Sequence, residues 1–386
     1  MNFVFLSPHF PPNFYRFAAT LKQHGVTVLG VADESYDALR PELKGALTEY
    51  YRVNDMHNYD ELVRALGYLT HRYGKLDRLD SHNEYWLETE AALRTDFNIF
   101  GLRLDDMQRV KRKSMMKETF VKAGVKVARG RVIGNLTDAL DLVKETGYPL
   151  VAKPDVGVGA ASTYKIQTEA ELERFFIEKP PFDYLLEEFI QGDIQTFDGL
   201  TDIDGNAVFL NSLVYSAGVM ETVLADEHIY YYTLREIPAD LEKVGRHVLQ
   251  EFDVRERFFH FEFFRQTGTG DIYALEVNMR PPGGLTLDMF NYACDLDIYD
   301  AWASIVAGDG YPYPEYSHKY FCCYVGRKFR RVYAHSHEDV LDYLAEHVVH
   351  HEPISGTFSN ALGNYGYLIR SPELNEIVDM AKYIQE

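Results

Sequence analysis

In the first hundred residues, short apolar runs alternate with segments in which apolar residues recur every three or four positions. The runs at residues 3–6, 26–32 and 76–79 are predicted strands. Residues 14–24, 59–73 and 85–93 have helical spacing. Strands that alternate with helices favour a parallel sheet covered on both faces. Ligands of such sheets bind beyond the carboxyl ends of the strands, which draws attention to loops 7–12, 33–34 and 81–84.

The pattern changes after Gly101. Residues 105–123 are predicted to be helical and carry a dense cluster of basic residues. A smaller α+β region follows, with helices predicted over 137–145 and after Thr168. Its predicted strands cover 149–153, 164–166 and 184–188, and residues 155–162 form a glycine-rich turn.

A third region is rich in predicted strands from about residue 195 and helical over 287–307. The tail adds a strand at 320–325 and helices that begin at Ser336 and at Ser371-Pro372. We therefore expect three regions, 1–104, 105–194 and 195–386, that pack as one body because no low-complexity linker separates them.

Composition narrows the class of protein. The 386 residues contain 39 Lys and Arg against 59 Asp and Glu, a formal charge of −20, which disfavours a nucleic-acid partner. No apolar stretch approaches the roughly 18 residues of a membrane span, and the N-terminus lacks the basic start of a signal peptide. Three cysteines cannot form a disulfide framework. We expect a cytoplasmic protein without a membrane partner.

The segment 259–284 carries the most informative chemistry. Two apolar strands flank the turn 267–270, which predicts a β-hairpin. Glu276 and Asn278 are two residues apart and share one sheet face, and the turn brings Glu262 alongside them. Two carboxylates and an amide oxygen suit Mg²⁺, and Arg280, two residues further, could brace a phosphoryl group. The alternative is a solvated strand face.

Two further segments suit a nucleotide. Lys153 ends a predicted strand before the glycine-rich turn, so backbone N–H groups and a lysine could cradle a phosphate. The sequence is neither a P-loop nor a dinucleotide fingerprint, and taken alone a glycine-rich hairpin is favoured. The strand before Gly192 ends in Glu187 and Glu188, whose backbone could meet an adenine edge. A strand that ends in a solvated turn is the alternative.

Taken in this order, Lys113, Lys153 with its turn, the strand 185–190 and the hairpin acids resemble the ATP-grasp enzymes of the carboxylate–amine ligase type. The resemblance covers about residues 1–310. It implies an ATP-grasp fold, of mixed α/β and α+β class, with an N-terminal Rossmann-like parallel-sheet domain of residues 1–104. Residues 105–194 would form the small lobe with the lid, and 195–386 the lobe with the metal-binding hairpin and a C-terminal extension.

The resemblance also implies roles for single residues. Lys113 and Lys153 would contact the ATP phosphates. Glu262, Glu276 and Asn278 would hold Mg²⁺, usually as two ions, with Mn²⁺ as an alternative. Arg280 and Lys153 would be catalytic. The lid and the adenine and ribose contacts would come from Gly157, Gly159, Ser162, Glu187, Glu188, Phe189, Ile190 and Asp193.

Three positions depart from the family pattern. Ile194 stands where an acid often binds the ribose, so Asp193 or Gln195 is expected to substitute. Ser162 stands where a third glycine is frequent, which would stiffen the lid. Lys111 competes with Lys113 for the phosphate role.

The resemblance implies that a substrate carboxylate attacks the γ-phosphate of ATP, and that an amine then attacks the acyl phosphate to form an amide or peptide bond. The substrates would be small molecules, with amino acids the leading candidates, and a homodimer is an open expectation. A kinase or acyl-transfer variant and a catalytically idle nucleotide-binding module are alternatives. A biotin carboxylase is less favoured.

Three segments leave the substrate question open. The stretch 215–232, with its tyrosines and with Glu221, Asp226, Glu227 and His228, either lines an acceptor pocket or is a packed strand beside an acidic loop. The basic run 327–331 either faces an anionic substrate or is solvated surface, which is favoured. The histidines between 335 and 351 are expected to be exposed residues at helix ends rather than metal ligands.

Overall fold

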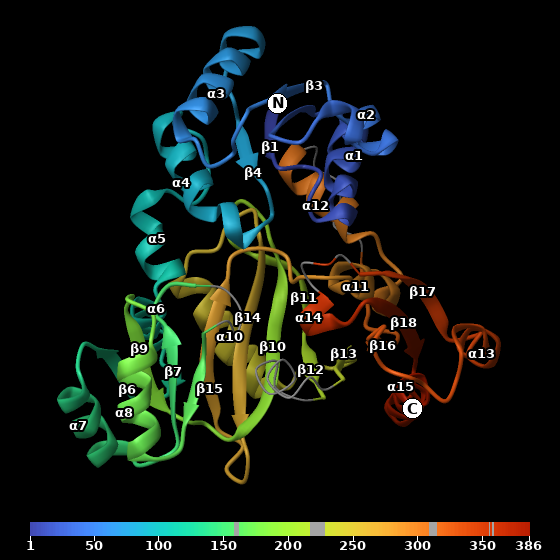
Figure 1. The fold of residues 1–386 in the computed structure, drawn as a ribbon. Helices are drawn as coiled ribbons and strands as arrows, with labels where there is room; N and C mark the ends of the chain where they lie inside the picture. Colours follow the sequence, from blue (N-terminus) through green and yellow to red (C-terminus); the bar gives the residue numbers. More distant parts are fainter. Residues whose placement is uncertain (158–161, 217–227, 309–314, 355, 357–358) are drawn as a thin grey trace.

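The computed structural model describes residues 1–386 except 158–161, 217–227, 309–314, 355 and 357–358. The strands of the described residues form three sheets (Figure 1). One is N-terminal and parallel, one is small and antiparallel, and one is large and mixed. The combination of α/β and α+β parts confirms the expected fold class.

The N-terminal sheet has the order β3-β2-β1-β4, and every neighbouring pair is parallel. The predicted strands and the 59–73 helix are confirmed, whereas β3 and α2 were not predicted. The elements are β1 (Asn2–Leu6), α1 (Tyr15–Gln23), β2 (Thr27–Ala32), α2 (Pro41–Ala46), β3 (Glu49–Arg52), α3 (Tyr59–Tyr73), β4 (Arg78–Asp80) and α4 (Leu87–Asp96), with short 3₁₀ turns at Pro12–Phe14, Tyr36–Ala38 and Glu84–Trp86.

A helix from the far end of the chain covers one face of this sheet. Helix α12 (Ile298–Ala307) packs beside α1, and the ring of Trp302 lies 5.6 Å from that of Phe3 and 4.9 Å from that of Phe17 (Figure 1). The opposite face packs against α3 and α4. The first hundred residues therefore share their core with the third region.

The predicted 105–123 helix is two helices. Helix α5 (Leu104–Lys111) ends at Arg112, whose extended backbone interrupts the helix before α6 (Lys113–Lys122). The break is stabilised because Asp155 accepts a hydrogen bond from Ser114 N and pairs with the Arg112 guanidinium at 3.0 Å. Lys113 thus stands at the start of a helix rather than within one.

The small sheet has the order β6-β9-β7-β8, and one of its faces packs against two helices. Its strands agree with prediction within one residue where they were predicted. The elements are β6 (Gly130–Ile133), α7 (Leu136–Thr146), β7 (Leu150–Pro154), β8 (Tyr164–Ile166), α8 (Glu169–Glu178) and β9 (Tyr184–Glu188).

The large sheet runs in the order β17-β18-β16-β13-β12-β10-β14-β15-β5, and β11 pairs with β10. Strand β5 (Lys126–Val127), from the predicted second region, joins its edge. The other strands are β10 (Gly192–Thr201), β11 (Ala207–Asn211), β12 (Leu213–Tyr215), β13 (Tyr230–Thr233), β14 (Phe258–Gln266), β15 (Ile272–Asn278), β16 (Phe321–Arg327), β17 (Val348–Pro353) and β18 (Tyr365–Ser371).

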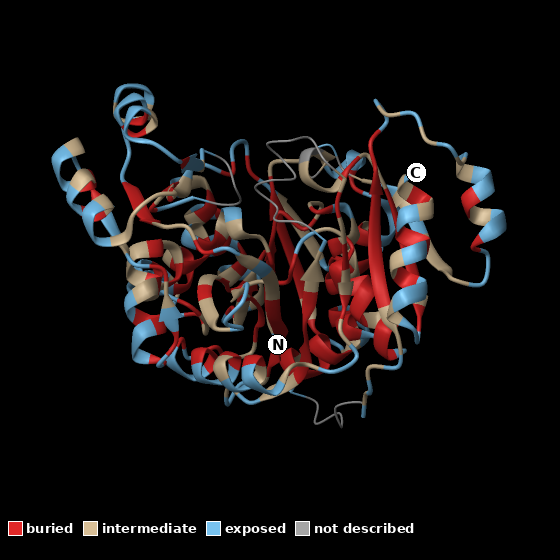
Figure 2. Ribbon diagram, turned by 90° about the horizontal axis from the view of Figure 1, so that it is seen from below, coloured by how far each residue is buried: buried red, intermediate tan, exposed pale blue. Residues whose placement is uncertain are grey.

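The remaining helices are α10 (Ala239–Glu251), α11 (Thr286–Cys294), α13 (His337–Tyr343), α14 (Ser359–Leu362) and α15 (Leu374–Gln385). Buried residues concentrate in the central strands, and the outer faces of the helices are exposed (Figure 2). Of the helices within the described residues, none has the length and apolar character that crossing a bilayer requires.

Two predicted helix boundaries are wrong. The 287–307 helix is divided into α11 and α12 by Asp295, which has a left-handed backbone at φ 51°. The last helix begins after Glu373 rather than at Ser371. Ser371 instead accepts a hydrogen bond from Glu373 N and donates one to Glu376, so it supports the turn before the helix.

A buried histidine lies two residues after the end of β4, in an aromatic surrounding. His82 is 5% exposed, and its ring lies 4.1 Å from that of Phe17 and 4.7 Å from that of Trp302. Burial lowers the pKa of His82 to about 4, although the Asp80 carboxylate partly opposes the shift. The ring is therefore neutral at pH 7.

This burial predicts a loss of stability in mild acid. Between about pH 6.5 and 4 the unfolded chain binds a proton that folded His82 does not, so the free energy of unfolding falls as the pH falls through this window. We expect roughly 2 kcal/mol of loss from this group between pH 7 and 5. Urea unfolding of the protein and of His82→Asn at both pH values measures it. Parallel pH profiles for the two proteins would contradict the prediction.

Candidate active site

The β14–β15 hairpin brings the predicted acids together. Glu262 is directly opposite Glu276, and His260 is opposite Asn278. Residues paired across strands project from the same face, so the hairpin forms one polar surface. Strand β10 continues it, with Thr196 opposite Glu262. The predicted hairpin and its shared face are confirmed.

The two opposed carboxylates have opposite pKa shifts. Burial is the main cause that raises the pKa of Glu276; the charge of Glu262 adds to it and Lys113 opposes it. Burial also acts on Glu262, but its hydrogen bond to His260 and the charge of Arg280 outweigh burial and lower its pKa. Two carboxylates at directly opposed strand positions repel one another, so a cation beside them would be favourable.

Lys113 faces this surface from the start of α6. Its ammonium lies 3.2 Å from Glu276 Oε1 and donates a hydrogen bond to the carbonyl of Gly157 at 3.0 Å. The competing Lys111 is directed elsewhere, to Glu84 Oε1 at 3.0 Å. Of the two lysines, the geometry favours Lys113 as a phosphate ligand, because its ammonium links the hairpin acids to the glycine-rich turn.

Lys153 belongs to a buried cluster on the small sheet. Glu187 accepts from Lys153 at 2.6 Å and lies 2.5 Å from Lys117, and all three side chains are largely shielded from water. Burial raises the pKa of Glu187, but the two ammonium groups outweigh it and the net pKa is lowered. Two cations around one carboxylate leave an excess positive charge, which suits an anionic ligand.

Arg280 links the hairpin to the N-terminal sheet. It donates to the carbonyl of Pro281 at 2.8 Å and to the amide oxygen of Asn278 at 3.3 Å, and its Nε lies 3.8 Å from Glu84 Oε2. Glu84 belongs to the 81–84 loop beyond the carboxyl end of β4. The structure therefore brings that loop to the predicted phosphoryl-binding arginine.

The strand end predicted to meet adenine is partly occupied by contacts within the protein. The N–H groups of Glu188 and Phe189 donate to the carbonyls of Arg129 and Pro149. The Glu188 carboxylate pairs with the Arg129 guanidinium at 2.6 Å, and the Lys165 ammonium lies 3.8 Å from the centre of the Phe189 ring. Ile190 is buried at the end of this segment.

The glycine-rich turn is described only at its ends. Gly159 lies outside the described residues, as do Glu221, Asp226 and Glu227 of the proposed acceptor segment. Ser162, which stands in place of a third glycine, has a φ of 57°. This left-handed conformation is one that glycine adopts without strain, so the position retains the backbone geometry of a glycine.

The prediction for Asp193 is not supported by the strand geometry. Side chains alternate along β10, so Ile194 shares the face of Thr196 and Glu262, whereas Asp193 and Gln195 face the other way. Gln195 there accepts a hydrogen bond from Arg265, which also pairs with Asp240 of α10 at 2.7 Å. Asp193 and Gln195, the two residues expected to replace a ribose-binding acid at position 194, therefore do not lie on the sheet face that carries Glu262 and Glu276.

Several site residues were missed by sequence reasoning. His260 lies between Asp198, at 2.6 Å, and Glu262, at 3.1 Å. Burial opposes protonation, yet the two carboxylates raise the pKa of His260 to about 9, so the ring is charged at neutral pH. His260 is two residues before Glu262 on the same strand, so the strand period alone could have placed it on the same face. The contact of Lys117 with Glu187 had no sequence signal.

The tyrosines predicted to line an acceptor pocket divide between the two faces of the sheet. Tyr215, Tyr231 and Tyr324 stack on the face of Glu262, with ring centres 5.0 and 5.2 Å apart. Tyr231 and Tyr324 are buried, and only Tyr215 is partly accessible. Tyr230 and Tyr232 belong to the core beneath α15. The described tyrosines of this segment therefore belong to packed strands.

The expectations for the basic run and for the histidines need correction. Arg327 and Lys328 are buried rather than solvated, and Arg327 donates to the carbonyl of Ile384 in α15, whereas Arg330 is exposed as expected. His350 and His351 lie on strand β17 rather than at a helix end. Within the described residues, no group of three or more His, Cys, Asp and Glu side chains is arranged to hold a metal.

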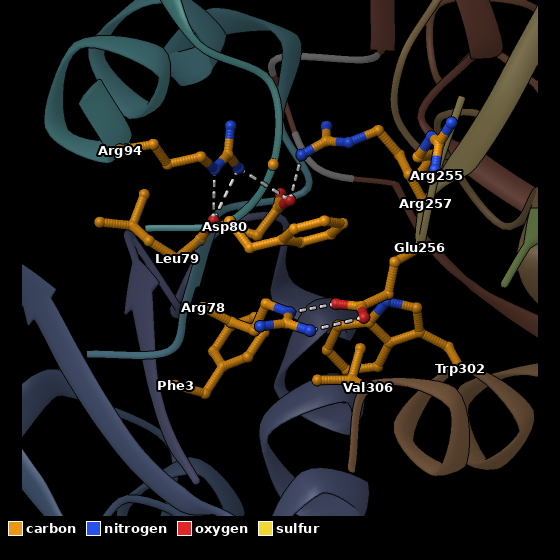
Figure 3. A pocket seen from close by; sticks show the side chains of 12 residues that line it. Phe3, Arg78, Leu79, Asp80, Arg94, Arg255, Glu256, Arg257, Trp302 and Val306 are labelled. Atoms are coloured by element: carbon orange, nitrogen blue, oxygen red, sulfur yellow. Dashed lines mark hydrogen bonds and ion pairs between the residues drawn. The ribbon is translucent and has the colours of Figure 1, made fainter. Parts of the chain in front are cut away.

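A small pocket lies away from this surface, between the N-terminal sheet and α12 (Figure 3). Its walls include two arginine–carboxylate pairs, Arg78 with Glu256 and Arg257 with Asp80. Because these ionic side chains bind each other, we assign the pocket to the packing between parts of the chain rather than to a substrate.

Comparison with known proteins agrees with this geometry. A family model described as an ATP-grasp domain matches residues 178–288, the stretch that contains β9, β10 and the hairpin. Residues 178–288 therefore match the ATP-grasp domain family. The large chain of carbamoyl phosphate synthase from Thermotoga sp. (strain RQ2) is 34% identical over 98 residues, which are 24% of this chain but 9% of that relative. An L-arginine-specific L-amino acid ligase from Bacillus subtilis is 21% identical and covers 61% of this chain and 58% of its own.

Solved structures show the ATP-grasp fold over the whole chain. An L-amino acid ligase from Bacillus licheniformis has a TM-score of 0.74 at 14% identity and covers 100% of this chain and 96% of its own. An N5-carboxyaminoimidazole synthetase from Staphylococcus aureus has a TM-score of 0.73 at 16% identity and covers 100% and 97%. A Hydrogenobacter thermophilus biotin carboxylase domain (TM-score 0.72, 17% identity, 98% and 88% covered) was solved with MgADP and bicarbonate.

The donor set on the β14–β15 hairpin fits Mg²⁺. Glu262 and Glu276 offer hard oxygen ligands, and their mutual repulsion would be relieved by a divalent cation. Asn278 adds an amide oxygen beside them. The set is too small for a complete protein cage, which agrees with the preference of Mg²⁺ for water and phosphate oxygens in its remaining positions.

The buried Lys153–Glu187–Lys117 cluster predicts unequal effects of two neighbouring substitutions. Glu187→Gln leaves two lysines without their shared carboxylate, and we expect it to lower the free energy of unfolding by about 3 kcal/mol. Glu188→Gln removes a pair whose arginine is 60% exposed, and we expect less than about 1 kcal/mol. Urea unfolding of both variants checks this; equal losses would contradict it.

Proposed function

We propose that the protein is an ATP-dependent carboxylate–amine ligase that forms an amide or peptide bond and releases ADP and phosphate. The observation that supports it most is the opposed pair Glu262 and Glu276, flanked on one surface by Asn278 and Arg280 and approached by Lys113. A carboxylate pair for a metal, together with cations for phosphates, is the arrangement that phosphoryl transfer requires.

In the proposed reaction Lys113 and Lys153 bind the phosphates of ATP and orient the γ-phosphate toward the substrate. A carboxylate oxygen of the first substrate attacks the γ-phosphorus, and ADP leaves. Glu262, Glu276 and Asn278 would hold Mg²⁺, which would neutralise part of the phosphate charge. The Arg280 guanidinium stabilises the charge on the transferred group and holds the acyl phosphate.

The second step consumes the acyl phosphate. An amine attacks the acyl carbon, phosphate leaves, and the amine loses a proton as the C–N bond forms. No nucleophilic side chain is required, because the activated group is part of the substrate. Shielding this intermediate from water prevents its hydrolysis. Amino acids are the proposed substrates, because two of the similar proteins are named as L-amino acid ligases.

We expect phosphate release from ATP to require both a carboxylate and an amine when pooled amino acids and small carboxylates are supplied with Mg²⁺. Mass analysis should show a product joined with loss of water. Arg280→Ala should lower kcat by about a thousandfold or more, because it removes charge stabilisation from the transferred group. Glu276→Ala should abolish turnover by removing a metal ligand.

Asp240→Asn is the matched control, since Asp240 pairs with Arg265 on the opposite face of the sheet. It should retain wild-type turnover. A phosphorylated product formed without an amine would indicate a kinase rather than a ligase. Full activity of Arg280→Ala would overturn the site assignment.

A further inference from the structure

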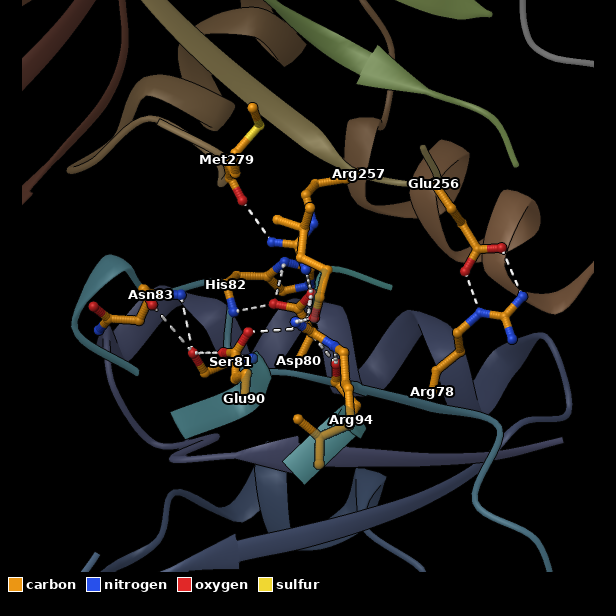
Figure 4. Close-up of polar contacts among 12 residues, drawn as sticks. Arg78, Asp80, Ser81, His82, Asn83, Glu90, Arg94, Glu256, Arg257 and Met279 are labelled. Carbon is orange, nitrogen blue, oxygen red and sulfur yellow. Dashed lines mark hydrogen bonds and ion pairs between the residues drawn. The ribbon is translucent and has the colours of Figure 1, made fainter. Parts of the chain in front are cut away.

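Arg257 connects the polar surface of the hairpin to the N-terminal sheet. It immediately precedes β14, and one end of its guanidinium donates to the main-chain carbonyl of Met279 at 2.5 Å. The other end donates to Asp80, the last residue of β4 (Figure 4). The side chain is 8% exposed, so both bonds are shielded from water. Apart from its packing pair with Asp80, Arg257 has no part in the proposed reaction.

Asp80 is itself held rigidly. Its Oδ2 accepts a hydrogen bond from Arg94 at 3.0 Å, and its Oδ1 accepts from the N–H of His82 at 2.7 Å. Arg94 is anchored by the carbonyl of Leu79 and by Glu90, and both charged side chains are 1% exposed (Figure 4). Because every member has a charged or backbone partner, the cluster can hold Arg257 in one position.

The carbonyl that Arg257 binds lies at a sensitive point of the chain. Met279 stands between Asn278, the proposed metal ligand, and Arg280, the proposed phosphoryl-binding residue. This carbonyl belongs to the peptide group that joins Met279 to Arg280, so fixing it restrains the backbone that carries Arg280 and, through Met279, the strand end that carries Asn278. Arg280 meets few fixed partners of its own: a carbonyl next to it, the Asn278 amide, and Glu84 at 3.8 Å.

We propose that Arg257 is a positioning residue: by binding the Met279 carbonyl from a base fixed by Asp80, it holds Asn278 and Arg280 in the geometry that nucleotide and metal require. The inference rests on the proposed function and adds a residue to its machinery. It also makes the N-terminal sheet part of the site, because the β4 end that carries Asp80 continues directly into the 81–84 loop that meets Arg280.

The planar fork of arginine is needed for this task. Its separate N–H groups reach a carbonyl and a carboxylate at once, whereas the single ammonium of lysine can reach one of them well. Displacement of a reacting group by about 1 Å can cost on the order of a hundredfold in rate. A residue that touches no substrate can therefore control turnover.

The chain offers a matched control in the same interface. Arg78 binds the neighbouring Glu256 through two hydrogen bonds, one of them 2.8 Å long, and lines the same pocket as Arg257 (Figure 3). Both arginines join the N-terminal sheet to the segment before β14. Among the described polar contacts, Arg78 makes no hydrogen bond to Met279, so it shares the structural role and lacks the positioning role.

The test measures MgADP binding by calorimetry in the full-length protein and in Arg257→Met, Arg257→Lys and Arg78→Met. For Arg257→Met we expect MgADP affinity at least tenfold weaker, with ADP affinity in EDTA within twofold of wild type. Arg257→Lys should recover part of the loss. Arg78→Met should keep both affinities within twofold. Urea midpoints establish that each variant is folded.

If Arg257→Met does not fold, Asp80→Asn, which keeps the size of the side chain and weakens its hold on Arg257, is expected to show the same selective loss. Wild-type MgADP affinity in folded Arg257→Met, or an equal loss in Arg78→Met, would overturn the positioning role. Failure of wild type to bind MgADP would overturn both proposals. The selective loss together with no amide formation would overturn the ligase and leave the positioning role standing.

Discussion

The electrostatic constraint at the centre of the molecule is the pairing of Glu262 with Glu276 across two adjacent strands. Like charges placed directly opposite one another destabilise a sheet unless cations lie beside them. Here His260 supplies that charge from β14, Arg280 from the residues just after β15, and Lys113 from the start of α6. The placement of α6 against the hairpin is therefore stabilised by the charge of these two carboxylates.

The same balance of charges recurs on the facing small sheet, with the signs reversed. Glu187 lies between Lys117 and Lys153, so one carboxylate serves two ammonium groups. Two opposed carboxylates thus lie at the centre of the hairpin surface, and two ammonium groups surround a single carboxylate beside β7 and β9. Such complementarity suits a ligand that combines a metal cation with an anionic nucleotide. It also explains how a protein of charge −20 can contain a locally cationic cluster.

The N-terminal sheet contributes more than a covering domain. Its β4 end supplies Asp80, which holds Arg257, and its 81–84 loop brings Glu84 to Arg280. Its core is completed by α12, whose Trp302 packs on Phe3. Movement of this sheet relative to the hairpin would break buried ionic contacts, so the sheet and the hairpin behave as one support for the site.

Local patterns in the sequence were enough to determine the alternation of strands and helices and the hairpin with Glu262, Glu276 and Asn278 on one face. The reason is that side-chain direction along a strand follows from a two-residue period. Only the tertiary structure decided that Asp193 faces away, that Arg112 interrupts a helix, and that α12 completes the first domain. It also decided that Arg257 reaches Met279. These depend on strand register and on contacts between residues distant in the chain, which no local period encodes.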